Sequence, residues 1–213
     1  MFKVTASEIR DLIIAFFVIS LSFGIANTGR DMNALMMILP PIMVGVGLGF
    51  ILHELGHKFV SMKYGYWAEF KLWPQGLILA LVTSFFGFVF AAPGAVYTYA
   101  NYMSDEINGK ISIAGPIVNI ILAIAFLIIA TIVYRSAFTS ETSLLIFVIC
   151  SLGYSINSFL AAFNLLPIGN LDGSKVMRWN IGIWFVTIAI AGIMTALSMT
   201  MGVENMVRII IGF

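Results

Sequence analysis

The sequence predicts an all-α, polytopic membrane protein. We expect about five or six transmembrane helices, with a small unit of strands and a re-entrant segment between the second and third helices. Hydrophobic residues make up 61% of the chain and charged residues only 10%, whereas a soluble domain has roughly 25% charged residues. The apolar residues are also gathered into long blocks, five of which approach the roughly 20 residues that a membrane span requires.

The five predicted spans follow one another along the chain. The first, residues 12–27, ends before a polar loop at residues 28–31. The second covers residues 32–62 and contains Pro40 and Pro41, where we expect the helix to kink or restart because proline has no N–H to donate. The other spans are predicted at residues 111–134, 143–166 and 180–201. The remaining tail is too short to cross a membrane by itself.

The segment from residue 66 to residue 103 has a different pattern. Residues 67–73 alternate between apolar and polar side chains, which is typical of a strand. Residues 77–86 are apolar but too few to cross a membrane, and residues 88–99 are rich in aromatic and β-branched residues. We expect a strand, a short piece that dips into the membrane, and a second strand. This unit must pack against the helices or lie at the interface, because unpaired strand edges cannot face lipid.

The lysine and arginine residues predict an orientation, since cytoplasmic loops collect these side chains. If the N-terminus lies inside and the chain crosses five times, eight of the eleven would be cytoplasmic: Lys3, Arg10, Lys58, Lys63, Lys71, Lys110, Lys175 and Arg178. Only Arg30, Arg135 and Arg208 would lie outside. We therefore expect a multi-pass protein of the cell membrane whose N-terminus and active-site opening face the cytoplasm.

Two further classes are excluded by the charges and the N-terminus. The formal net charge of +1 and the scattered basic residues provide no surface for nucleic acid. Residues 1–11 contain charges and no small-residue cleavage site after a short apolar core, so they do not form a removable signal. The first apolar stretch is expected to stay as a membrane anchor.

Both histidines of the chain lie in one motif, His53-Glu54-Leu55-Gly56-His57. Residues i and i+4 share a helix face, so both imidazoles can bind one metal ion. Glu54 lies beside the first histidine and can take a proton from water at that metal. The motif is the HExxH signature of zinc hydrolases. Charged groups at membrane depth are costly unless they have a function, which favours a metal site over a structural polar cluster.

The position of the motif predicts a site near the cytoplasmic side. If the helix enters from outside at Pro41, His53 lies about 18 Å along its axis, in the inner half of the bilayer. Gly45 and Gly49 share the helix face of His53 and form a stripe of small residues that lets a partner helix approach closely. Lys58 is expected to extend its ammonium group to the inner interface.

A catalytic zinc ion needs three protein ligands, and the chain has no third histidine. Cys150 is not expected to be the third ligand, because it is predicted in the outer-middle part of the fourth span. Four carboxylates are also not expected to reach the metal, since they are predicted in solvent, at lipid head groups or on the outer side: Glu69, Asp105, Glu106 and Glu141. Asp172 follows a long uncharged run and a break caused by proline and glycine, at the depth expected of His53. Spacing alone leaves an equal alternative, in which Asp172 caps a short basic helix at residues 174–178.

Three groups of residues together resemble the site-2 protease family of intramembrane zinc metalloproteases. The first is the motif at residues 53–57. The second is Asn-Leu-Leu-Pro at residues 164–167 followed by Leu-Asp-Gly at residues 171–173, which is similar to the N-x-x-P…D-G element of that family. The third, Gly-Pro-Ile-Val-Asn at residues 115–119, is similar to its G-P-x-x-N element. The resemblance covers roughly residues 41–178.

The resemblance implies a role for each matching residue. His53, His57 and Asp172 would be the ligands of one zinc ion per chain, and Glu54 would be the general base. Asn164 would steady the developing oxyanion or the substrate backbone. The two other amides in spans, Asn119 and Asn157, are instead expected to form hydrogen bonds between helices.

The chain departs from the family pattern in the loop around its Asp-Gly pair. Ser174 stands where a second glycine is usual, and Asn170 stands where proline is frequent. No stretch remains for a PDZ or CBS regulatory domain. Residues 1–213 are therefore expected to form a single membrane-embedded metalloprotease domain with its catalytic core at about residues 41–178.

The resemblance implies regulated intramembrane proteolysis, the hydrolysis of peptide bonds within or next to transmembrane segments. The partners would be a transmembrane protein substrate and the lipid bilayer. A substrate helix must unwind to expose its carbonyls, and a strand edge within residues 66–99 could hold it extended. The alternatives are a membrane protein that binds or transports metal, and a catalytically inactive homologue. The chain lacks the repeated halves that are expected of a transporter. An inactive homologue would leave Glu54 without a role.

Overall fold

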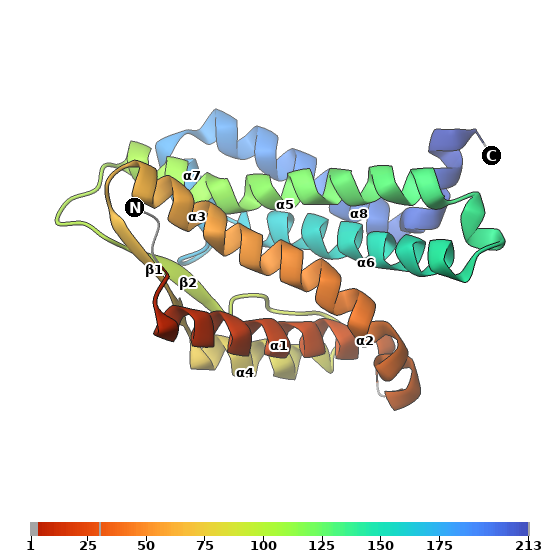
Figure 1. Ribbon diagram of the computed structural model, residues 1–213. Helices are drawn as coiled ribbons and strands as arrows, with labels where there is room; N and C mark the ends of the chain where they lie inside the picture. Colours follow the sequence, from red (N-terminus) through yellow and green to blue (C-terminus); the bar gives the residue numbers. More distant parts are fainter. Residues whose placement is uncertain (1–3, 30, 213) are drawn as a thin grey trace.

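The computed structural model describes residues 4–29 and 31–212, so Lys3 and Arg30 lie outside the described residues. Figure 1 shows a bundle of long helices with a small sheet at one end. Within the described residues, five helical segments are long and apolar enough to cross a membrane: Ala6–Thr28, Met32–Lys63, Asp105–Val133, Glu141–Asn164 and Ile181–Ile211. The all-α, polytopic fold predicted from the sequence is confirmed.

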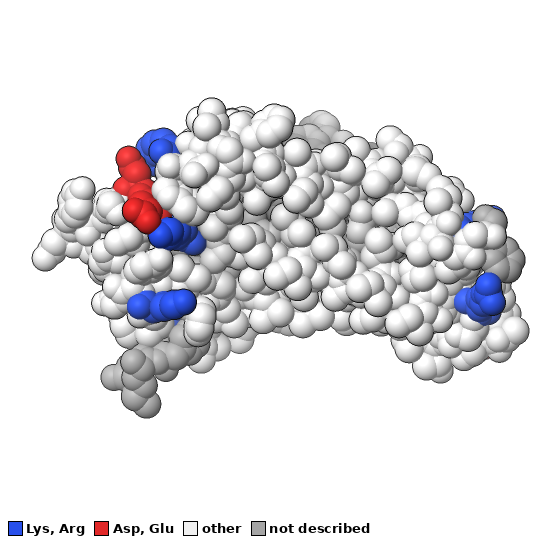
Figure 2. All heavy atoms as spheres, turned by 90° about the horizontal axis from the view of Figure 1, so that it is seen from above, with Lys and Arg blue, Asp and Glu red and all other residues white. Residues whose placement is uncertain are grey.

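The surface of the molecule suits a lipid environment. Figure 2 shows Lys and Arg at both ends of one face, Asp and Glu at one of these ends, and a wide uncharged band between them. The spans expose large apolar side chains such as Phe17, Ile128 and Phe185. Apolar patches of this extent are typical of a surface that faces hydrocarbon rather than water.

Helix α1 (Ala6–Thr28) begins six residues before the predicted span. Its N-terminus is capped by Thr5, whose Oγ1 accepts a hydrogen bond from the Glu8 N–H at 3.2 Å. The added residues include Glu8 and Asp11, whose carboxylates contact the sheet. Gly29 ends the helix with a φ of 63°, a backbone conformation that glycine adopts without strain.

The second span is one long helix with three parts: α2 (Met32–Val46), a π-helical turn (Gly47–Ile51) and α3 (Leu52–Lys63). Helical structure continues through Pro40 and Pro41, and Figure 1 shows the first turns of α2 at an angle to the long remainder of the helix. The π-helical turn was not predicted. Such wide turns are frequent at functional sites, and this one ends directly before the HExxH motif.

The segment between the second and third spans contains β1 (Trp67–Leu72), α4 (Pro74–Ser84) and β2 (Gly94–Tyr99). The two strands pair antiparallel, with Phe70 opposite Val96, and α4 lies along α1 (Figure 1). The predicted order of strand, short apolar piece and strand is therefore confirmed, and the dip of the middle piece into the membrane stays a prediction. The second strand is shorter than predicted, because it begins only after Pro93, which cannot donate a ladder hydrogen bond.

The first turns of α1 hold the outer edge of β1. Oxygen atoms of Glu8 and Asp11 accept hydrogen bonds from the Phe70 N–H at 3.1 Å and the Leu72 N–H at 3.3 Å. Thr5 Oγ1 donates to Glu69 Oε1 at 2.5 Å, and this hydrogen bond lowers the pKa of Glu69. Since these backbone groups point away from β2, the edge of β1 is already occupied.

The C-terminal half consists of α5 (Asp105–Val133), a 3-10 turn (Ser136–Phe138), α6 (Glu141–Asn164), α7 (Asp172–Trp179) and α8 (Ile181–Ile211). The helical path of α8 is broken at Gly202, with φ 74° and ψ 153°. The predicted span of residues 180–201 thus ends where expected. Beyond the break, Val203, Met206 and Val207 are buried in an apolar core with residues of α5 and α6.

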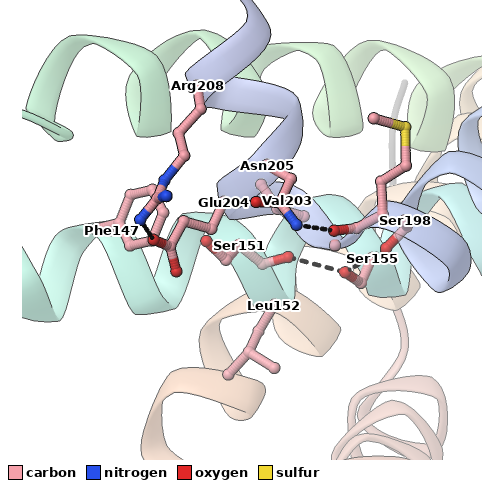
Figure 3. A pocket seen from close by; sticks show the side chains of 11 residues that line it. Phe147, Ser151, Leu152, Ser155, Ser198, Val203, Glu204, Asn205 and Arg208 are labelled. Atoms are coloured by element: carbon pink, nitrogen blue, oxygen red, sulfur yellow. Dashed lines mark hydrogen bonds and ion pairs between the residues drawn. The ribbon is translucent and has the colours of Figure 1, made fainter. Parts of the chain in front are cut away.

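A cavity of about 500 Å³ lies between α6 and α8 beside this break. Figure 3 shows Ser151, Ser155, Ser198, Glu204 and Arg208 around it. The cavity lies towards the C-terminal end of the bundle, whereas the sheet, α7 and the end of α3 lie at the opposite end (Figure 1). It is therefore separate from the HExxH motif.

Candidate metal centre

The structure brings the three predicted metal ligands together. His53 and His57 lie on α3 with their Nε2 atoms 3.0 Å apart. Asp172, the first residue of α7, places Oδ2 at 3.4 Å from His53 Nε2 and 3.1 Å from His57 Nε2. All three side chains are buried. Across residues 4–29 and 31–212 they form the single group of this kind that could hold a metal ion.

The other ring nitrogen of each histidine has its own partner. His57 Nδ1 lies 2.8 Å from the Ile111 carbonyl oxygen on α5. A carbonyl can only accept, so His57 Nδ1 carries a proton, and in the neutral imidazole Nε2 then has a free lone pair. His53 Nδ1 lies 2.5 Å from Asn119 Oδ1, which requires the same tautomer. Both lone pairs are therefore directed at the space shared with Asp172, as in metal sites with a supporting second shell.

The orientation of Asn119 follows from its other contacts. Its Nδ2 donates to the Gly49 carbonyl at 3.0 Å and to Asn157 Oδ1 at 2.9 Å. Because the Gly49 oxygen only accepts, the amide nitrogen must face it and Oδ1 must face His53. The predicted hydrogen bonds between helices are confirmed for Asn119 and Asn157. The contact with His53 was not predicted.

One signal in the sequence could have revealed this contact. Asn119 lies four residues after Gly115, so both share a face of α5. A Cβ atom added at Gly115 would lie 2.5 Å from His57 Nε2 and 2.6 Å from His53 Nε2. Glycine is thus required for the close approach of α5 to the imidazoles, and the residue one turn later also faces the site.

The stripe of small residues before the motif packs as predicted. A Cβ atom at Gly45 would lie 3.1 Å from Gly153 Cα, and one at Gly49 would lie 2.7 Å from Asn157 Oδ1. Both neighbours are on α6, the helix that leads to Asp172. The close approach of α2 and α6 therefore sets the position of the loop that carries the third ligand.

Asp172 does not cap α7. The N-cap position is occupied by Leu171, and Asp172 is the first helical residue. Its Oδ2 faces the two histidines and its Oδ1 lies 3.7 Å from Lys175 Nζ. The neighbouring Gly173 allows α7 to approach the end of α6, since a Cβ atom there would lie 1.9 Å from the Leu165 carbonyl oxygen. The alternative in which Asp172 acts as a helix cap is wrong.

Glu54 lies beside this cluster and is 7% exposed. Its Oε2 atom is buried and has no hydrogen-bond partner among the described residues. The backbone N–H of Val96, on β2, is directed at the carboxylate as a donor. A buried carboxylate oxygen without a partner is costly in a purely structural role. This position suits a group that exchanges a proton with a bound molecule.

Lys58 does not extend to the interface as predicted. Its side chain is fully buried, and its ammonium group forms an ion pair with Glu8 of α1. Glu8 lies 50 residues earlier in the chain, and no local pattern in the sequence indicates the pairing. The added polar turns of α1 supply the partner, so the ammonium group has no need to reach water.

Asn164 lies at the end of α6. Its Nδ2 donates to the Leu160 carbonyl of its own helix at 2.9 Å, and its side chain is partly buried. The role predicted for it, stabilisation of an oxyanion, stays a prediction.

The cluster fits a tetrahedral zinc ion. Nitrogen and oxygen ligands bind zinc at about 2.1 Å, which places two ligands of one ion about 3.4 Å apart. The separations between His53, His57 and Asp172 are 3.0–3.4 Å. Two neutral imidazoles and one carboxylate also form a donor set used by catalytic zinc. The residues present therefore suit this metal.

Comparison with known proteins finds relatives that share most of the chain. One of Methanocaldococcus jannaschii, named "Putative zinc metalloprotease MJ0611", is 42% identical over 186 residues, which cover 87% of this chain and 91% of that protein. One of Bacillus subtilis, named "Putative zinc metalloprotease YwhC", is 30% identical over 66% of this chain and 69% of that protein. A third, "Zinc metalloprotease MJ0392" of Methanocaldococcus jannaschii, is 26% identical over 80% of this chain and 41% of that protein. No protein-family model matches the chain, and no solved structure gives a significant match.

Proposed function

Because the chain belongs to the zinc metalloprotease family of these relatives, we propose that it is an intramembrane peptidase of the site-2 protease type. It would hydrolyse peptide bonds within or next to transmembrane segments of other membrane proteins. The observation that carries this proposal is the meeting of three ligand side chains beside Glu54, whose Oε2 atom is buried without a partner among the described residues, at the end of a helix long and apolar enough to span a membrane. Zinc is the metal of this family, and the cluster suits it.

Each residue of the site would have a separate role in hydrolysis. His53, His57 and Asp172 would hold zinc, which as a Lewis acid activates water and polarises the scissile carbonyl. Glu54 would take a proton from the attacking water and deliver it to the leaving amine. Asn119 keeps the imidazole of His53 in the tautomer that a metal ligand requires.

The substrate must present an extended backbone, and the sheet offers one edge for it. The outer edge of β1 is occupied by side chains of α1, as described above. When two residues lie opposite each other in an antiparallel pair, their N–H groups point either both towards the partner strand or both away from it. The Phe70 N–H points away from β2, as its hydrogen bond to Glu8 shows. Since Phe70 is paired with Val96, the Val96 N–H is directed outwards, and it faces Glu54. We therefore assign the substrate strand to the free edge of β2 rather than to β1.

The charges favour an opening towards the cytoplasm. Among the described residues, Arg10, Lys63, Lys71, Lys110 and Arg178 belong to the elements around the sheet or to the helix ends beside it. Of the described residues, Arg135 and Arg208 are the basic ones at the opposite end of the bundle. We therefore propose that the sheet and the metal site lie on the cytoplasmic side, because basic residues prefer that side.

A comparison of variants in detergent tests the proposal. Purified wild-type protein is expected to contain zinc and to cleave a synthetic single-span peptide. Glu54→Gln should keep zinc and lose cleavage by a factor of about 10² to 10⁴, the usual contribution of a general base. Asp172→Ala should lose both zinc and cleavage.

The matched control is Glu106→Gln, which changes an exposed carboxylate of α5. It should retain both zinc and cleavage. Equal cleavage by wild type and Glu54→Gln would refute the proposed mechanism.

A further inference from the structure

A buried ion pair joins the first helix to the helix of the HExxH motif. The ammonium group of Lys58 and the carboxylate of Glu8 have side-chain exposures of 0% and 1%. The second oxygen of Glu8 accepts the Phe70 N–H of β1 at 3.1 Å. Lys58 Nζ also lies 5.7 Å from the centre of the Trp67 ring, at the start of β1. The pair therefore links α1, α3 and the sheet.

These contacts form a closed path that begins and ends on α3. Lys58 lies one helical turn after Glu54, so both side chains share a helix face. The path leaves α3 at Lys58, passes through Glu8 to Phe70, and crosses the sheet to Val96. The path returns to α3 through the Val96 N–H, which is directed at the Glu54 carboxylate.

A second contact aligns the same strand with the same helix. Thr98 Oγ1 lies 2.8 Å from Ser61 Oγ. Thr98 is two residues after Val96 and thus lies on the same side of β2. Ser61 is seven residues after Glu54, two turns along the same face of α3. The free edge of β2 consequently runs along the helix face that carries the predicted general base.

We propose that Glu8 and Lys58 are positioning residues that fix the register of β2 against Glu54, and thereby select the substrate bond that is cleaved. This inference rests on the proposed function, because the register of β2 matters only if its edge holds the substrate. The position of each backbone group along β2 sets the position of each carbonyl of a paired substrate strand. A shift of the strand would bring a different peptide bond to Glu54.

The chemistry of the pair fits positioning better than stabilisation. A buried ion pair loses the hydration of both charges, so apolar residues of similar volume often give equal or greater stability. A charged pair, however, accepts only a narrow range of distances and directions. It holds the sheet at one place on α3, whereas an apolar contact would allow it to slide.

The test replaces both charges at once. The double variant Glu8→Leu with Lys58→Met leaves no unpaired buried charge and keeps the volumes similar. The matched control is Glu106→Leu with Lys110→Met, which removes an exposed Glu–Lys pair of α5. Cleavage of a synthetic single-span peptide is followed by mass spectrometry of the products, together with kcat and KM. Hydrogen exchange of β1 and β2 is measured in zinc-free protein, independently of activity.

We expect the double variant to fold and bind zinc. The double variant should cleave the peptide at several neighbouring bonds rather than at one main bond. Its kcat should fall on the order of tenfold to a hundredfold with little change in KM, because the reacting groups are misplaced. Exchange at Val96 and Phe70 should become faster. If the double variant does not fold, Glu8→Gln with Lys58→Met, which keeps an acceptor for the Phe70 N–H and leaves no unpaired buried charge, should show the same spread to a smaller extent.

Two results would overturn the inference. One is cleavage by the double variant at the wild-type bond with the wild-type rate. The other is unchanged exchange at Val96 and Phe70. Failure of the proposed function looks different, since Glu54→Gln would then cleave as well as wild type, or wild type would cleave nothing. In that case the exchange measurement still decides whether the ion pair positions the sheet.

Discussion

Gly115→Ala should lower zinc affinity by at least about 100-fold. The added Cβ atom would lie 2.5 Å from His57 Nε2 and 2.6 Å from His53 Nε2. These are the two nitrogen atoms predicted to bind the metal. In an exposed helix position the same change is favourable by about 1 kcal/mol, because alanine has a higher helix propensity than glycine. The expected loss is therefore specific to the site.

The size of the effect follows from the distances. Ordinary contacts of a Cβ atom begin at 3.4 Å, so the nearest imidazole must move by about 0.9 Å. Metal ligands tolerate deviations of about 0.2 Å. The displacement exceeds this tolerance more than fourfold. Loss of a second-shell contact alone lowers metal affinity about 10- to 100-fold, so we expect a loss of at least about 100-fold when the ligands themselves are displaced.

Zinc affinity is measured by competition with a chromogenic chelator, and melting temperature is measured on the same samples. Gly192→Ala is the matched control, because it is also a helical glycine and has nothing within 4 Å of the added atom. Gly192→Ala should melt at or above the temperature of the zinc-free wild type, whereas Gly115→Ala should lose about 1–3 kcal/mol of stability, because its added atom overpacks the buried imidazoles. If Gly115→Ala binds zinc as tightly as Gly192→Ala, the assignment of the metal to the two Nε2 atoms is wrong.

Three further changes test other contacts. Asn119→Ala should lower zinc affinity about 10- to 100-fold in the same competition assay, because His53 loses the acceptor that fixes its tautomer. Gly49→Ala should lower stability by about 1–3 kcal/mol in thermal unfolding, since the added atom would lie 2.7 Å from Asn157 Oδ1. Gly202→Ala should cost about 1–2 kcal/mol in the same measurement, because its φ of 74° is strained for any residue with a Cβ atom. Unchanged zinc affinity in the first variant, or unchanged unfolding temperatures in the others, would contradict the corresponding contact.

Features with a short sequence spacing were predicted well. The four-residue separation of His53 and His57 fixes their common face, because it is set by the geometry of one helix. The spans were predicted because a membrane requires long apolar stretches. The alternation of residues 67–73 likewise predicted β1, which covers Trp67–Leu72.

Features that depend on distant parts of the chain were harder to predict. Asp172 lies 115 residues after His57, and its spacing alone left a capping role equally open; only the family resemblance separated the two. The contact of Asn119 with His53 and the pairing of Lys58 with Glu8 arise when separate helices pack together. A one-dimensional pattern does not contain these distances. The π-helical turn was missed for the same reason, since its Gly49 carbonyl is held by an amide of another helix.

The contact between Val96 and Glu54 indicates how the substrate edge and the predicted base depend on each other. The Val96 N–H is directed at the Glu54 carboxylate, whose Oε2 atom is buried and has no hydrogen-bond partner among the described residues. A substrate strand that pairs with β2 would supply a carbonyl for the Val96 N–H, and the Glu54 carboxylate would then be free to accept a proton from water. One hydrogen bond is exchanged for another, so entry of the substrate leaves no buried donor without a partner. The substrate that unwinds onto this edge would thus release the base at the place where its own bond is to be broken.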